Sequence, residues 1–244
     1  MIRLKALPPP IELDAESVSK LTDEYIYNGK TVWRKPFIVK KLLEMSNGKC
    51  CYCECDLKEE AKYMEVEHFL CKKLYKEKVV VWTNLLPACK RCNSTKSDLD
   101  VEKVPIIHPV NMSPQDHIYL SNYRIREKTE VGKNTWKELN LNDTNRLCKK
   151  RFEIGQKINE VIEDIKDDLC NDIDNSKVRK SSKKILALLE ECQPEKAYSA
   201  TTATILFNDV ASDYLKIKEI LIANQIWSPD FDNLERIARS IALI

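Results

Sequence analysis

The sequence contains no apolar run long enough to cross a membrane, since no window of its 244 residues approaches the roughly 18 apolar residues of a spanning helix. The integral membrane class is therefore excluded. No long apolar run precedes Pro8, Pro9 and Pro10, so we expect no secretory signal and a cytoplasmic protein without a membrane role. Internal repeats and low-complexity tracts are also missing, which excludes repeat architectures. The net charge of +2 is too small to indicate nucleic-acid binding by itself.

Cysteine is abundant by contrast, with ten residues. In a reducing compartment we expect these thiols to be metal ligands or buried side chains rather than disulfides. Two Cys-x-x-Cys pairs stand out, Cys50/Cys53 and Cys89/Cys92. Four thiolates in such pairs suit a closed, tetrahedral zinc site of the structural kind. Cys51 and Cys55 offer other pairings, but only Cys50/Cys53 repeats the spacing of the second pair. The remaining thiols are predicted to be ordinary buried side chains: Cys71, Cys148, Cys170 and Cys192.

The segment between the two cysteine pairs carries groups suited to hydrolysis. It is longer than the about 15–20 residues of a simple zinc ribbon, so it houses something more. It contains His68, one of only three histidines, directly after Glu67. A neutral imidazole is a natural general base near pH 7. Glu67 and Asn93 offer the oxygen ligands that Mg²⁺ or Mn²⁺ prefers. The pattern indicates a metal-bridged phosphodiester site.

The hydrophobic pattern predicts a mostly helical α+β fold with a small zinc-stapled ββα core. Expected helices begin after Asp14 and at Pro36, and they end at Asn28-Gly29 and Asn47-Gly48. Expected strands are Lys62–Glu67 and Val79–Trp82, followed by a short helix over Lys90–Ser97. A further strand is predicted over His117–Glu127, and apolar stripes predict helices over Ile154–Leu169, Ala203–Leu221 and Leu234–Ile241. The predicted organisation is N-terminal helices (1–47), the zinc core (48–100), a mixed connection (101–141) and a helical C-terminal region (142–244).

These residues together resemble an HNH endonuclease of the zinc-bearing ββα-metal type over about residues 48–98. The resemblance rests on the cysteine pairs, Glu67-His68, the run Trp82-Thr83-Asn84-Leu85-Leu86 and the run from Cys89 to Lys96. It implies that His68 is the general base, and that Glu67 and Asn93 ligate one catalytic Mg²⁺ or Mn²⁺. It also implies that Asn84 fixes the loop and orients His68. The sequence departs from the family where Glu67 replaces the commoner Asp and where Asn93 stands at the position of the last His.

A basic segment surrounds this site. Between Lys72 and Lys96 lie seven basic residues and a single acid, Glu77. We interpret this segment as a phosphate-contacting patch. The resemblance implies that Lys96 in particular faces the phosphate backbone. The predicted nucleic-acid contacts are Lys72, Lys73, Lys90, Arg91 and Lys96.

The outline of the whole chain is similar to the HNH subunit of Septu-type antiphage systems, including retron-associated ones. The shared outline is Met1-Ile2, Pro8-Pro9-Pro10, the central HNH segment, and Leu139-Asn140-Leu141-Asn142 before a helical tail. This resemblance implies an ABC-type ATPase partner (PtuA-like) that holds the nuclease inactive until infection. The expected function is metal-dependent hydrolysis of nucleic acid, with DNA favoured and RNA as the other substrate. The alternative is a non-catalytic zinc module that binds nucleic acid or protein. The sequence does not indicate a homo-oligomeric state.

Overall fold

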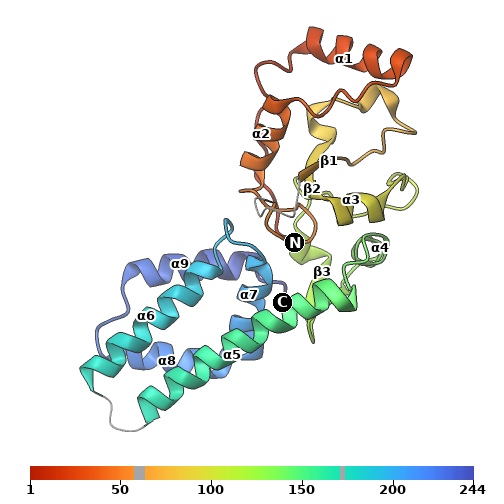
Figure 1. The fold of residues 1–244 in the computed structure, drawn as a ribbon. Coiled ribbons are helices and arrows are strands. Elements are labelled where there is room, and N and C mark those ends of the chain that lie inside the picture. The colour runs from red at the N-terminus through yellow and green to blue at the C-terminus, as the bar shows by residue number, and fades with distance from the viewer. Residues whose placement is uncertain (58–63, 171–173) are drawn as a thin grey trace. The chain divides into compact units, whose positions relative to one another are not determined.

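The chain folds as two units (Figure 1). The computed structural model describes residues 1–57, 64–170 and 174–244. The first unit comprises Met1–Ile118 and Arg126–Leu141, and the second comprises Tyr119–Ile125 and Asn142–Ile244. Helices dominate both units, and the sheets of the described residues have two strands each, which confirms the predicted mostly helical α+β class. In the described part of the chain, no helix is both long and apolar enough to span a bilayer.

The first unit is built from short elements around a strand pair. Its helices are α1 (Ala15–Asn28), α2 (Pro36–Met45), α3 (Lys90–Lys96) and α4 (Glu130–Glu138). Its strands are β1 (Met64–His68) and β2 (Leu85–Cys89), and its 3-10 turns are η1 (Lys76–Lys78), η2 (Trp82–Asn84) and η3 (Pro114–Asp116). The chain passes directly from β2 into α3, so the two strands and the helix form one local strand–strand–helix unit.

The ends of the first helix follow from local chemistry. The Asp14 carboxylate accepts a hydrogen bond from the backbone N–H of Ser17 at 2.8 Å, which satisfies one of the unpaired amides of the first turn. At the other end Gly29 has φ +64°, a left-handed conformation that costs glycine little, and its N–H donates to the Tyr25 carbonyl. Both predicted ends of α1 are therefore confirmed.

Strands β1 and β2 run antiparallel and position the segment that holds Glu67 and His68. In their register Glu67 lies opposite Leu86 and His68 lies opposite Leu85. β1 agrees with the expected strand over Lys62–Glu67, although residues 62 and 63 lie outside the described part of the chain. α3 agrees with the expected helix that begins inside the second cysteine pair.

The second expected strand, Val79–Trp82, is wrong. Its residues form a turn that leads into η2, and the real strand begins at Leu85. Val79 and Val80 have no exposed surface, so their β-branched side chains serve as core inside a loop rather than as a pleated surface. The strand that replaces it contains Pro87, a residue that donates no backbone hydrogen bond and is tolerated here because a two-stranded sheet has only edge strands.

The connection over residues 101–141 is more regular than expected. The predicted strand His117–Glu127 is a pair of strands, β3 (Ile118–Ser121) and β4 (Arg124–Glu127), which turn at Asn122 and Tyr123 with positive φ angles. Helix α4 follows and begins at Thr129, whose hydroxyl accepts from the N–H of Gly132 at 3.2 Å. The sequence pattern did not predict α4.

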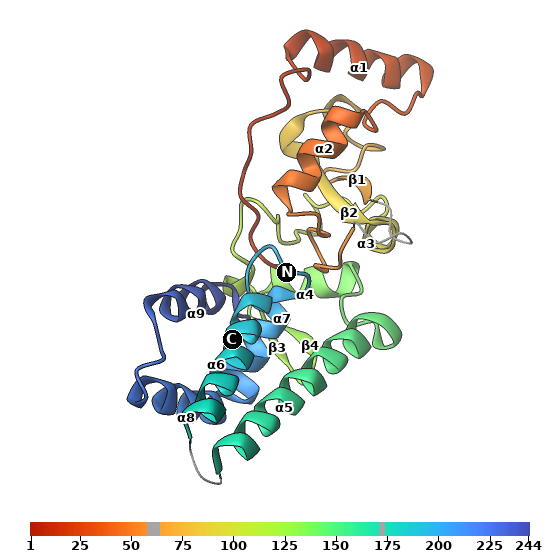
Figure 2. The same ribbon diagram turned by 60° about the vertical axis from the view of Figure 1, so that its left-hand side comes forward.

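The second unit is a helical assembly. Its elements are the π-turn η4 (Thr144–Cys148), α5 (Lys149–Cys170), α6 (Asn175–Glu191), α7 (Ser199–Thr204), the π-turn η5 (Ile205–Asp209), α8 (Ala211–Ala223) and α9 (Pro229–Ile241). α5 and α6 lie side by side and run antiparallel (Figures 1 and 2). Ile162 and Ile165 of α5 and Ile185 and Leu189 of α6 are buried, as expected for the apolar stripes of a helical core. The predicted turn Asp172–Ser176 includes residues 172 and 173, which lie outside the described part of the chain.

One predicted helix of this unit is interrupted. The pattern predicts one helix over Ala203–Leu221, but the structure divides it into α7, η5 and α8, with a bend at Val210. The Thr204 hydroxyl donates to the Ala200 carbonyl at 2.6 Å and accepts from the Leu243 N–H at 2.8 Å. This back-bonding competes with regular helix geometry at the end of α7, where η5 begins.

Candidate functional site

Four buried cysteine thiols converge in the first unit. Cys50 and Cys53 come from the turn after α2, which an isolated bridge between Lys49 and Asp56 closes. Cys89 ends β2 and Cys92 lies in the first turn of α3. All four sulfur atoms lie within 4.8 Å of one another. The structure therefore brings together the four thiols that the sequence predicted.

The geometry of this cluster fits zinc. Zn–S bonds of about 2.3 Å place the sulfurs of a tetrahedral site about 3.8 Å apart, and the Sγ atoms of Cys53 and Cys89 are 3.8 Å apart. Cys51 and Cys55 are buried nearby but are not among the four. The thiols predicted to be ordinary buried side chains are buried at Cys71, Cys148 and Cys192, while the side chain of Cys170 lies outside the described part of the chain.

The Cys89 side chain also starts the helix that follows. Its Sγ accepts a hydrogen bond from the backbone N–H of Cys92 at 3.4 Å, so Cys89 is the N-cap of α3. α3 has seven residues, which is well below the length at which an isolated helix persists in water. The metal-binding cluster is thus the local feature that fixes where α3 begins.

Two side-chain pairs hold α3 against β1. Asn93 and Lys96 are three residues apart on one face of the helix, and Glu65 and Glu67 are two apart on one face of the strand. Asn93 donates its Nδ2–H to Glu65 Oε2 at 2.5 Å, and the Lys96 ammonium lies 2.8 Å from Glu67 Oε1. Each pair links α3 to β1, so the four side chains lie between the helix and the strand.

The structure corrects the expected surface position of Lys96. Its side chain is fully buried, and its ammonium contacts Glu67 and also donates to the backbone carbonyl of His68 at 2.9 Å. A buried ammonium remains charged only where acceptors surround it, and the carboxylate and the carbonyl supply them. Lys96 is therefore a structural cation of the candidate site rather than a residue free to meet a phosphate.

His68 points to the opposite face of β1 from Glu67. Its Nε2 lies 2.9 Å from the carbonyl oxygen of Val79, and its ring meets that of Trp33 edge to face, with 5.0 Å between centroids. Burial, together with the nearby cations of Lys72 and Lys96, lowers the pKa of His68 to about 4, although the hydrogen bond to the Val79 carbonyl acts in the opposite direction. The imidazole is therefore neutral at pH 7.

Asn84 fixes the loop between the two strands. Its Oδ1 accepts from the N–H of Leu70 at 2.7 Å, and its Nδ2 donates to the carbonyls of Leu70 and Lys78 at 3.1 and 3.0 Å. The Lys78 carbonyl is adjacent to Val79, whose own carbonyl contacts the His68 ring. The side chain of Asn84 thus reaches His68 only through the backbone that it holds, and no hydrogen bond between the two side chains is present in the described residues.

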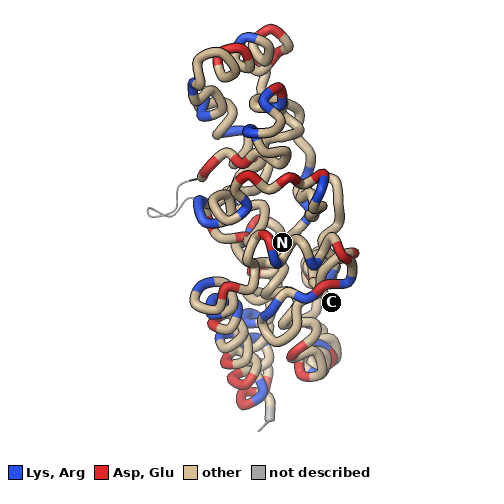
Figure 3. The backbone as a smooth tube through the Cα atoms, turned by 90° about the vertical axis from the view of Figure 1, so that its right-hand side faces the viewer, with Lys and Arg blue, Asp and Glu red and all other residues tan. Residues whose placement is uncertain are grey.

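The other residues of the predicted basic patch make different kinds of contact. Lys72 places its ammonium 5.2 Å from the centroid of the Trp33 ring. Lys73 is exposed and lies 3.0 Å from Asp98. Arg91 donates to the backbone carbonyls of Leu139 and Asn140 in the same unit. Lys90 is exposed. Along the chain as a whole, basic and acidic residues are interspersed (Figure 3).

Sequence reasoning missed three groups that contact the predicted site residues. Trp33 contacts His68 from the loop between α1 and α2, and the Val79 carbonyl holds the His68 ring. The Tyr52 hydroxyl donates to Glu67 Oε1 at 3.3 Å. No sequence signal could have identified the carbonyl, because every residue has one. Tyr52 lies between Cys50 and Cys53, and that position was the one available clue.

No protein-family model matches the chain. Two relatives are similar to it over most of its length. The chain is 45% identical to the Septu protein PtuB of Bacillus thuringiensis, in an alignment of 239 positions that covers 96% of this chain and 92% of that protein. It is 26% identical to the Septu protein PtuB of Bacillus mycoides (strain KBAB4), in an alignment of 232 positions that covers 75% of this chain and 77% of that protein.

Proposed function

The chain belongs to the Septu protein PtuB family, and on this basis we propose that it is a metal-dependent HNH endonuclease and the effector subunit of a Septu antiphage defence complex. Nucleic acid is the proposed substrate, with DNA favoured over RNA. An ABC-type ATPase is the proposed partner that keeps the nuclease inactive until infection. The strand–strand–helix arrangement of β1, β2 and α3 beside four clustered cysteines supports the HNH assignment.

The observation that carries the proposal is the way His68 is held. Its Nε2 contacts the carbonyl oxygen of Val79, and a carbonyl only accepts hydrogen bonds. The neutral ring therefore carries its proton on Nε2, which leaves the lone pair of Nδ1 as the base. A general base in this state contributes about 10²–10⁴-fold to a hydrolysis.

Glu67 and Asn93 would hold the catalytic Mg²⁺ or Mn²⁺. A carboxylate and an amide oxygen are hard donors of the kind these ions prefer. The contacts of Glu67 with Lys96 and Tyr52 both use Oε1, which leaves Oε2 as the ligand atom. Asn93 uses Nδ2 on Glu65, which leaves Oδ1. These two oxygens would ligate the ion, which when bound would stabilise negative charge on the phosphate and on the leaving oxygen.

In the proposed reaction His68 Nδ1 takes a proton from a water molecule, and the resulting hydroxide forms a bond to phosphorus. The bond between phosphorus and the 3′-oxygen breaks in line with this attack. The 3′-oxygen leaves as an alkoxide and takes a proton from a water molecule, while His68 returns its proton to the solvent, so the products carry 5′-phosphate and 3′-hydroxyl ends. Asn84 acts on the backbone of Leu70 and Lys78, and Lys96 acts on the Glu67 carboxylate and the His68 carbonyl, rather than on the substrate.

Nicking of supercoiled plasmid in the presence of Mg²⁺ tests the proposal. The protein is assayed alone and as a complex co-purified with its ATPase subunit. We expect His68→Ala to lose at least about 100-fold of the rate while it remains folded and retains its bound zinc. His117→Ala is the matched control, because the His117 ring contacts Thr129 outside β1, β2 and α3. Full activity of the His68 variant would contradict the assignment of His68 as the general base.

One observation favours a second function, a non-catalytic zinc module. Glu67, a proposed metal ligand, is 2% exposed and already paired with a buried ammonium. If that pair is purely structural, the unit would bind nucleic acid or protein without cleaving it. Failure of the unsubstituted protein to nick plasmid, both alone and with its ATPase subunit, would favour this function.

A further inference from the structure

The N-terminal half of α6 in the second unit is strongly basic. Its first ten residues, 175–184, contain five cationic side chains and no acidic one. These residues are Lys177, Arg179, Lys180, Lys183 and Lys184. The neighbouring helix α5 carries acids, so the question is which of the five cations α5 neutralises.

One row of these cations, Lys180 and Lys184, is neutralised by α5. The Lys180 ammonium lies 3.1 Å from Asp168. The Lys184 ammonium lies 2.9 Å from Asp168 and 3.0 Å from Asp164. We call Lys180 and Lys184 the paired row. Their charges are balanced within the protein, so they add little to its attraction for an anion.

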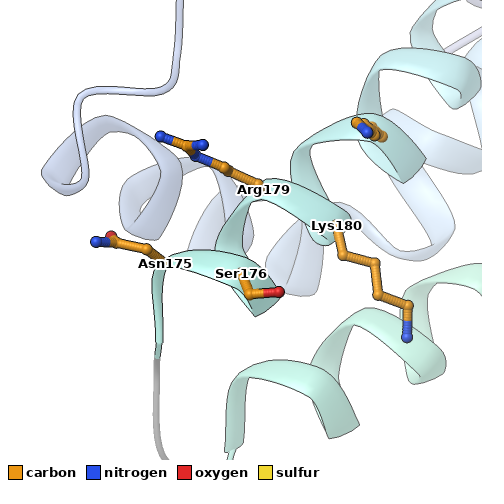
Figure 4. Close-up of a pocket in the computed structure, with 5 residues that line it drawn as sticks. Asn175, Ser176, Arg179 and Lys180 are labelled. Atoms are coloured by element: carbon orange, nitrogen blue, oxygen red, sulfur yellow. The ribbon is translucent and has the colours of Figure 1, made fainter.

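A second row of cations lies one residue earlier in each turn. It consists of Arg179 and Lys183, which we call the open row. Both side chains are exposed, and within the described residues neither has an acidic partner. Figure 4 shows Arg179 and Lys180 leaving the helix in different directions, with Lys180 directed toward the neighbouring helix and Arg179 away from it. The open row therefore presents two uncompensated positive charges one helical turn apart.

The open row borders a surface hollow of about 550 Å³. The residues that line it are Asn175, Ser176, Arg179, Lys180 and Lys183 (Figure 4). The free amides of the helix start do not contribute, because the Asp174 carboxylate already accepts from the N–H groups of Ser176 and Lys177 at 2.7 and 2.8 Å. The positive potential of the hollow thus comes from the side chains of the open row.

The composition of this hollow distinguishes between classes of partner. Protein–protein interfaces are anchored by aromatic and apolar side chains and are depleted in lysine at their core. All five lining residues are polar, and no aromatic or aliphatic side chain is among them. Arg, Lys, Ser and Asn are the side chains that commonly contact phosphate oxygens in nucleic-acid complexes. The chemistry of the hollow favours a phosphate backbone.

We propose that the open row, Arg179 and Lys183, is a binding surface for the phosphate backbone of a nucleic acid, separate from the candidate nuclease site. It reads no bases, so it binds strands of any sequence. It needs no divalent ion, because the two cations are part of the protein. The proposal does not depend on cleavage by the first unit and would hold equally for a non-catalytic protein.

Salt-dependent DNA binding tests this surface. The full-length chain is titrated, without Mg²⁺, into labelled duplex DNA of about 20 base pairs over about 50–200 mM salt, and binding is followed by fluorescence anisotropy. Each phosphate contact contributes about 0.9 to the slope of log K against log salt. We expect the double variant Arg179→Gln, Lys183→Gln to reduce that slope by about 1.8 and to weaken binding of unrelated sequences alike.

Neutralised lysines outside the hollow provide a matched control. The double variant Lys166→Gln, Lys184→Gln removes the same charge from ammonium groups that acids of the same unit already pair and that do not line the hollow, and we expect it to leave the slope unchanged. All four positions lie at or near the surface, and thermal melting of both variants verifies that they fold. An open-row variant with the slope of the unsubstituted protein would overturn the proposal. Equal slope losses in the two variants, or no salt-dependent binding by the unsubstituted chain, would overturn it as well.

Discussion

The ammonium of Lys96 lies 2.8 Å from the carboxylate of Glu67, and both side chains are almost completely buried. The same ammonium donates to the carbonyl of His68, so one side chain holds both residues of the Glu-His pair from the end of α3. A buried ion pair contributes little net stability, because desolvation of the two charges offsets their attraction. Loss of one partner is costly, however, since it leaves the other charge buried and unpaired.

The first prediction concerns this pair. We expect Lys96→Met to lower the free energy of unfolding by about 3–5 kcal/mol, because Glu67 would remain buried without its counter-charge. Chemical denaturation with urea measures the loss. The matched control is Lys73→Met, since the pair of Lys73 with Asp98 is exposed on both sides and exposed pairs contribute only about 0–1 kcal/mol. Equal losses in the two variants would contradict the structural role of Lys96.

The second prediction concerns the cysteine cluster. We expect Cys89→Ser to release zinc and to unfold the strand–strand–helix unit, because a structural zinc site contributes an apparent ~10–16 kcal/mol to folding. Metal content by mass spectrometry and thermal melting measure the two effects. Cys71→Ser is the control: Cys71 lies in the same unit, and its thiol contacts the Asp98 carbonyl rather than the cluster. Retention of one zinc per chain by the Cys89→Ser variant would show that Cys89 is not a zinc ligand.

The third prediction concerns Trp33 and depends on the proposed nuclease function. The edge-to-face contact of Trp33 with His68 holds the imidazole in place, and such a contact contributes about 0.5–1.5 kcal/mol. If it serves only to orient His68, Trp33→Ala should reduce kcat roughly 2- to 10-fold with KM unchanged. Trp33→Phe keeps an aromatic edge and should restore most of the rate.

Steady-state cleavage assays separate kcat from KM for these variants. Trp227→Ala is the control, because Trp227 packs on Phe231 in the second unit. A rise in KM without a change in kcat would instead assign Trp33 to substrate binding.

The features that the sequence predicted well depend on local chemistry. The cap at Asp14, the glycine end at Gly29 and the start of α3 inside the second cysteine pair all follow from residues close together in the chain. The cysteine cluster was predicted because its spacing is repeated, although its two halves are distant in sequence. Each of these features has one dominant physical cause, which a short sequence motif reveals.

The features that the sequence did not predict depend on packing. Val79 and Val80 have high strand propensity but are buried in a loop, and the strand that forms instead contains Pro87. Lys96 was expected to face a phosphate backbone because of the HNH resemblance, and only the fold reveals Glu67 beside it. Propensity describes one residue at a time, so it fails where a partner distant in the sequence decides the outcome.

The order of the cysteines along the chain has a consequence for synthesis. Cys50 and Cys53 precede the strand that carries His68, and Cys89 and Cys92 follow it. During translation the first two thiols therefore leave the ribosome well before the second two, and the cluster cannot close until residue 92 has emerged. Since Cys89 also caps α3, neither the helix nor the Lys96 contact can form earlier. We expect the candidate site to stay unassembled on the nascent chain and to form in one step when zinc joins the two pairs.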